Sequence, residues 1–158
     1  MHRKVAFATI CLLAFLAPSF LHPLQAQALP CSNASVSGKW ALTTTGSITG
    51  VGDVAAVGIY TATPSGHLTG SQTRSLGGQV AVETFSGTFS VKPDCTGSAV
   101  IEVFQSGTLV RTSTLDLAYD DNIREQRAIF RSVVLPDGTS LPTVLTIEAR
   151  RISVRDND

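Results

Sequence analysis

The chain has 158 residues, of which 43% are hydrophobic and 15% charged, and its 12 basic and 12 acidic residues give a formal net charge of zero. This balance excludes the basic surface of a nucleic-acid-binding protein and the composition of an acidic tail protein. The apolar content excludes intrinsic disorder, and the length suits one domain.

The first 28 residues have the pattern of a secretory signal peptide. His2–Lys4 is a short basic start, Val5–Leu21 is an uncharged apolar run, and Ala26–Ala28 is a small-x-small cleavage motif. The alternative is an uncleaved membrane anchor, but the run is short for a span and a proline interrupts it. We therefore expect residues 1–28 to be removed. Residues 29–158 would then be an exported domain, periplasmic or extracellular, with no transmembrane segment.

Two cysteines, Cys31 and Cys95, remain in the expected mature chain, because Cys11 lies in the apolar run. Two cysteines in an exported protein most simply form one disulfide, which here would tie the start of the domain to the turn at 93–97. The alternative is a reactive thiol. It would need a neighbouring base or cation, and the sequence indicates none.

Strand-forming residues dominate the mature chain. It is rich in Thr, Ser, Val and Gly, and short runs are separated by turn residues at intervals of roughly ten residues. The glycine pair Gly77-Gly78 suits a two-residue hairpin, and short connections favour antiparallel neighbours. In chain order the predicted strands are 39–45, 54–63, 67–76, 79–85, 87–91, 99–104, 109–119, 123–135 and 141–152.

A meander of this kind has two exposed edges unless the sheet closes on itself. Closure of eight strands gives a barrel wide enough for side chains or one small ligand. We therefore predict an all-β fold, a single antiparallel up-and-down β-barrel of eight to nine strands, and treat a sandwich as the alternative. Gly58 and Gly70 lie inside predicted strands, which fits the bends of a curved sheet.

The segment Gly38-Lys39-Trp40, at the start of the first predicted strand, resembles the G-x-W signature of lipocalins in the calycin superfamily. The resemblance implies a closed barrel in which an arginine of the last strand packs over the tryptophan, and Arg150 or Arg151 matches that arginine. The mature chain is also similar to small secreted bacterial proteins of unknown function, and allene oxide cyclase-like barrels are a second comparison. These resemblances imply the fold and transfer no ligand or catalytic residue.

The sequence offers little for catalysis. His67 is the one histidine of the expected mature chain, no G-x-S-x-G elbow appears, and the two cysteines are expected to be bonded. We therefore predict no catalytic residue, no metal site and no cofactor.

Charged residues that share a strand face with apolar ones are candidates for the barrel interior. Glu102 shares a face with Phe104, and Arg127 shares one with Ile129. Buried charges are costly unless paired, so such residues would mark a ligand site. The alternative, a solvated outer face, is the commoner case. Together with two aromatic residues, the candidate ligand-binding set is Trp40, Tyr60, Glu102, Phe104 and Arg127.

Three functions are compatible with this reading, in the order in which we rank them. The first is a module that binds a small apolar ligand in the barrel. The second is a structural or cell-surface interaction protein with a filled core. The third is a barrel-type cyclase or isomerase that would use Glu102 or Glu125 as an acid, which requires an inward carboxylate.

Overall fold

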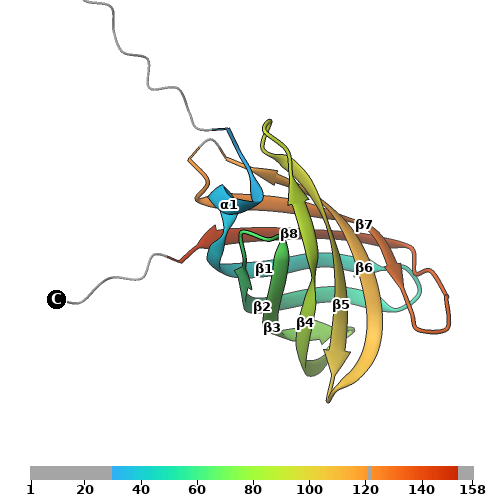
Figure 1. Cartoon of the computed structure of the whole chain (residues 1–158). Helices are drawn as coiled ribbons and strands as arrows, with labels where there is room; N and C mark the ends of the chain where they lie inside the picture. The colour runs from blue at the N-terminus through green and yellow to red at the C-terminus, as the bar shows by residue number, and fades with distance from the viewer. Residues whose placement is uncertain (1–29, 121, 153–158) are drawn as a thin grey trace, which may run out of the picture.

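The computed structural model describes residues 30–120 and 122–152, which form a closed barrel of eight antiparallel strands in sequence order (Figure 1). The last strand pairs with the first and closes the sheet. The predicted signal peptide, residues 1–28, lies outside the described residues. A one-turn helix, α1 (Asn33–Val36), precedes the strands. The strands are β1 (Gly38–Ile48), β2 (Gly52–Ala62), β3 (His67–Leu76), β4 (Gln79–Val91), β5 (Thr96–Gln105), β6 (Thr108–Tyr119), β7 (Glu125–Val134) and β8 (Thr143–Arg151).

Alternating burial defines the inner and outer faces of the barrel. On β1, Trp40, Leu42 and Thr44 are buried, whereas Ala41 and Thr43 between them are exposed. Successive side chains of a strand point to opposite faces, so this two-residue period turns one face toward the core. The predicted all-β, antiparallel, up-and-down barrel is confirmed. No helix in the described part of the chain is both long and apolar enough to cross a membrane.

The count of strands is eight because β4 is continuous, so the prediction of separate strands at 79–85 and 87–91 was wrong. Gly87 pairs with Leu68 on β3 and with Ile101 on β5 inside the ladder. A Cβ added at Gly87 would lie 2.1 Å from the carbonyl oxygen of Val100. The glycine therefore permits close approach of a neighbouring strand and does not end its own.

The predicted hairpin at Gly77-Gly78 is confirmed, since both residues have positive φ angles, 56° and 84°, as a tight two-residue turn requires. Gly70 has a different use. A Cβ there would lie 2.5 Å from Cζ of Phe85, so the missing side chain makes room for the phenyl ring inside the barrel.

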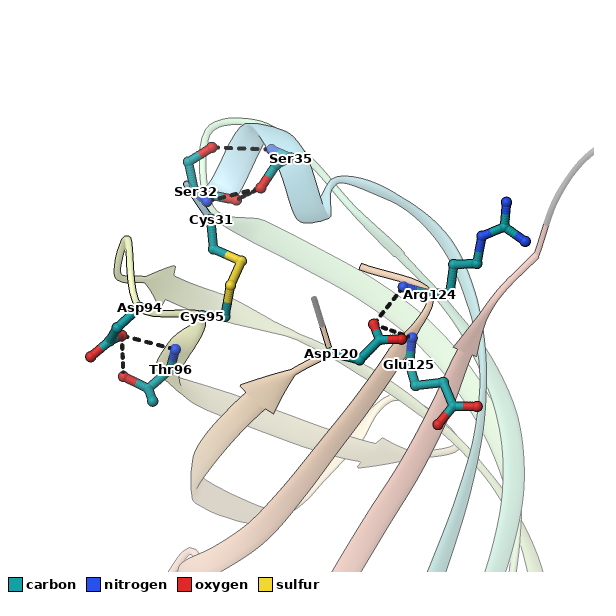
Figure 2. Close-up of a disulfide and its surroundings, with 9 residues drawn as sticks. All are labelled: Cys31, Ser32, Ser35, Asp94, Cys95, Thr96, Asp120, Arg124 and Glu125. Atoms are coloured by element: carbon teal, nitrogen blue, oxygen red, sulfur yellow. Dashed lines mark hydrogen bonds between the residues drawn. A yellow bond between two sulfur atoms is a disulfide. The ribbon is translucent and has the colours of Figure 1, made fainter. Parts of the chain in front are cut away.

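One end of the barrel is covered by α1 (Figure 1). The predicted disulfide between Cys31 and Cys95 is confirmed and ties the residue before the helix to the β4–β5 turn (Figure 2). Ser32 and Ser35 form a capping box at the start of the helix. Asn33 accepts a hydrogen bond from the backbone N–H of Val91 at 2.8 Å, which joins α1 to β4. The short helix is therefore held to the barrel by covalent and polar links.

Candidate ligand-binding cavity

The covered end of the barrel is filled by an aromatic group around Trp40, which is fully buried. Its ring nitrogen donates a hydrogen bond of 3.0 Å to the carbonyl of Val36, the last residue of α1. The ring lies parallel to that of Tyr60, with 6.2 Å between centroids, and meets the ring of Tyr119 edge-on at 5.8 Å. Because Val36 is also fully buried, this end is closed.

Arg151 supports the same group from the last strand. Its guanidinium carbon lies 5.5 Å from the centroid of the Trp40 ring, and its Nη2 donates to the backbone carbonyls of Ser35 (2.9 Å) and Ser37. The side chain of Arg150 is 81% exposed. The expectation of an arginine over the tryptophan is confirmed, and Arg151 is the residue that fills this position.

A cavity of about 230 Å³ lies inside the barrel. Its walls are mainly aliphatic and aromatic, and each of the eight strands contributes to them. Side chains of the wall, one from each strand in order, are Leu42, Tyr60, Leu68, Phe85, Ala99, Leu115, Phe130 and Leu145. At its inner end the hydroxyl of Tyr60 donates a 2.8 Å hydrogen bond to Oε1 of Gln126, so the polar tip of this ring is satisfied. The cavity therefore presents a mostly apolar surface.

The cavity is reached from the end opposite α1. Leu76, Gln105 and Leu141 line it at that end, where Leu76 and Leu141 are partly exposed and Gln105 is exposed. These residues lie at strand ends or in the β7–β8 connection, far along each strand from Trp40. A ligand would enter between them.

A buried cluster of charged side chains forms part of the cavity wall. It is centred on Glu83 of β4, whose side chain is fully buried. Its Oε1 accepts hydrogen bonds from Nε of Arg74 (2.7 Å) and Nη1 of Arg111 (2.8 Å). Its Oε2 accepts from Nη2 of Arg111 (2.7 Å) and Nε2 of Gln72 (2.8 Å). The cluster therefore joins β3, β4 and β6 across the inside of the sheet.

Two opposing effects set the pKa of Glu83. Burial alone would raise it, because a carboxylate loses its hydration, but the hydrogen bonds and charge of Arg111 outweigh this effect. With further hydrogen bonds from Arg74 and Gln72, the pKa falls from 4.5 to about 2. Glu83 is ionised at neutral pH, so two guanidinium groups share one carboxylate and the cluster carries one excess positive charge.

The structure separates the five candidate residues of the sequence. Tyr60 lines the cavity, and Trp40 lies beneath it in the closed end. Phe104 is half-buried and is not a wall residue, and Glu102 is exposed. Arg127 is 71% exposed on the outer face. Trp40 and Tyr60 thus belong to the interior. Glu102 and Arg127 lie on the solvated outer face, which was the alternative in the sequence analysis.

A β-bulge in β7 lies beyond Arg127 and changes which residues of that strand point inward. The pairing of β6 with β7 shifts so that Leu115 faces Phe130 and Thr114 faces Ser132, which leaves Arg131 as an extra residue. Beyond the bulge the inward and outward positions exchange, so Val133 is buried while Ile129 is 52% exposed. Arg127 lies before the bulge, on the outer face of Ile129, and pairs with Glu148 at 3.4 Å.

The residues of the Glu83 cluster were missed in the sequence. A signal was present, because each shares a strand face with buried or half-buried apolar residues: Arg74 with Leu76, Glu83 with Phe85, and Arg111 with Leu115. Among residues 30–120 and 122–152, no group of three or more His, Cys, Asp or Glu side chains could hold a metal ion.

The fold and cavity define a closed eight-stranded β-barrel with an internal, mainly apolar site. No protein-family model and no curated protein matches the chain. Among solved structures, it matches the S-type phycobiliprotein lyase CPES from Guillardia theta, with 8% sequence identity and a TM-score of 0.43. The match covers 78% of this chain and 92% of that one. The fold assignment rests on the strand pairing of this chain itself.

Proposed function

We propose that this protein is an exported barrel that binds a small, mainly apolar molecule in its cavity. The observation that carries the proposal is the cavity of about 230 Å³ with its aliphatic and aromatic wall. Protein interiors are packed as densely as organic crystals, and voids larger than a water molecule are few. An apolar space of this size is therefore a feature that packing alone does not produce.

The volume limits the size of the ligand. An engineered apolar cavity of about 150 Å³ takes up benzene, so a cavity of 230 Å³ suits a substituted single ring or a medium-length alkyl chain. Burial of such a molecule would contribute roughly 25 cal/mol for each Å² of apolar surface removed from water.

The cavity favours this function over a structural protein with a filled core, since a core of that kind would leave no such space. The cyclase or isomerase alternative required Glu102 or Glu125 to point inward and act as an acid. Glu102 is exposed, and Glu125 is 39% exposed and pairs with Arg150 on the outer face at 2.7 Å. Glu83 does point inward, but its two oxygens are already held by Arg74, Arg111 and Gln72, and it does not line the cavity. Export is supported by the signal-peptide pattern and by the disulfide, which persists in oxidising compartments.

Isothermal titration calorimetry with 1-octanol, indole and octanoic acid tests the proposal. We expect saturable one-site binding of at least one of these probes. Ala56→Leu, which adds bulk to a cavity-lining position, should weaken that binding by at least about tenfold. Ala55→Leu is the matched control, because Ala55 is exposed on the outer face. Absence of saturable binding of all three probes, or equal effects of the two variants, would overturn the proposal.

A further inference from the structure

The charges on the wall of the cavity are unbalanced. Arg74 and Arg111 line the cavity, and among the described wall residues there is no aspartate or glutamate. Glu83 lies behind the two arginines, with its side chain fully buried. A molecule in the cavity would therefore meet guanidinium groups and no carboxylate.

Glu83 has no capacity left for further donors. Each of its two oxygens already accepts two hydrogen bonds, and an ionised carboxylate offers about four lone-pair sites in all. Arg111 uses Nη1 and Nη2 on this carboxylate, whereas Arg74 uses only Nε. The remaining N–H groups of Arg74 must find a partner elsewhere.

Nη1 of Arg74 is buried and has no hydrogen-bond partner among the described residues. The side chain as a whole is 15% exposed, so water reaches little of it. A buried charged donor without a partner is costly, and a charged acceptor is the group that would compensate it best. Other atoms of Arg74 line the cavity, one inward residue from Leu76 near the entrance, so a rotation of the guanidinium would bring Nη1 to a ligand there.

We propose that the cavity binds an apolar carboxylic acid, with Arg74 as the residue that receives its carboxylate. This inference rests on the proposed function and specifies the chemistry of its ligand. A single negative charge balances the single excess positive charge of the Glu83 cluster, which favours a carboxylate over a doubly charged phosphate. The apolar part of the ligand extends toward Phe85 and Tyr60, away from the entrance.

The experiment compares octanoic acid with 1-octanol, which has the same chain without the charge, at neutral pH by calorimetry. We expect the wild-type protein to bind the acid at least about tenfold more tightly. Arg74→Met should abolish this preference, measured as the ratio of the affinities for the acid and the alcohol in the same variant. Arg127→Met is the matched control, since it removes an equal charge from the outer face and should keep the preference.

Equal affinity for the acid and the alcohol in the wild-type protein would overturn the carboxylate site and leave the binding of apolar molecules standing. A preference that survives Arg74→Met would also overturn it. Failure of all probes to bind would instead overturn the proposed function itself. If Arg74→Met does not fold, Arg74→Lys, which keeps the charge but loses the planar fork, should lower the preference by several-fold, and an unchanged preference would count against the site.

Discussion

The guanidinium of Arg151 lies over the ring of Trp40, 5.5 Å from its centroid, while its Nη2 donates a 2.9 Å hydrogen bond to the backbone of Ser35. One side chain of the last strand thus contacts both the aromatic group that fills the closed end and the helix that covers it. The first and last strands, already paired in the sheet, are joined a second time through this residue.

Arg151→Met should lower the free energy of unfolding by about 2 kcal/mol, because the charged hydrogen bonds and the contact with the ring are lost together. Urea unfolding followed by Trp40 fluorescence measures the change. Arg150→Met is the control, since the side chain of Arg150 is 81% exposed, and it should change stability little. Equal losses in the two variants would contradict the role of Arg151.

Replacing both cysteines, Cys31→Ser with Cys95→Ser, should lower the free energy of unfolding by on the order of 4 kcal/mol, because the bridge closes a loop across a sequence separation of 64 residues. Chemical unfolding of the variant and of the reduced wild-type protein should give the same value. Free-thiol titration of native residues 29–158 should find no reactive sulfhydryl, and two reactive sulfhydryls would contradict the bridge.

The low pKa of Glu83 makes acid stability a test of its cluster. Its folded-state pKa of about 2 lies below the ordinary 4.5, so the carboxylate stabilises the fold above pH 4.5. This stabilisation, on the order of 3 kcal/mol, is lost as the pH falls from about 4.5 to about 2. Glu83→Gln should be less stable at neutral pH, because two buried guanidiniums lose their partner.

Unfolding measured across this pH range should show the difference between wild type and Glu83→Gln shrinking as the pH falls. Glu102→Gln, at an exposed position, should follow the wild-type curve. A difference that stays constant with pH would show that Glu83 is not ionised in the folded protein.

Both tyrosines of the chain should resist ionisation. Burial raises the pKa of Tyr60 well above 10.0, and nearby Tyr119 raises it further against the opposing charge of Arg151. Burial likewise raises the pKa of Tyr119, again against Arg151. The fold is therefore stabilised below pH 10 and loses this stabilisation as the pH rises beyond it. Near-ultraviolet absorbance should show phenolate near pH 10 only in denaturant, and a phenolate band of the native protein at that pH would contradict the burial of both rings.

The barrel could be predicted because short stretches of the sequence indicate its strands and turns. Strand residues alternate between buried and exposed positions, turns carry glycine pairs such as Gly77-Gly78, and the two cysteines of the mature chain have one simple pairing. Gly87 misled the prediction because a glycine that ends a strand and one that admits a neighbouring backbone look the same in sequence.

The cavity was harder to predict because its polar cluster joins strands that are not neighbours in the sheet: Gln72 and Glu83 are partners in the β3–β4 hairpin, but Arg111 reaches Glu83 from β6. Arg74 and Glu83 are nine residues apart, and Arg111 lies a further 28 residues along the chain. The alternation of apolar and polar residues shows which side chains of a strand point inward only where no β-bulge interrupts the strand. The extra residue Arg131 exchanges the two faces of β7, whereas Arg127 was a candidate because it shares a face with Ile129, an apolar residue that the structure places outside.

The described chain enters the barrel at Cys31 and leaves it at Ile152, whose N–H bonds to the carbonyl of Lys39, so both ends sit beside α1 (Figure 1). A label or solid support attached beside Cys31 or Ile152 would lie at the end of the barrel that α1 covers. The opening near Gln105 would then face free solution, which allows uptake to be measured on immobilised protein without blocking the entrance.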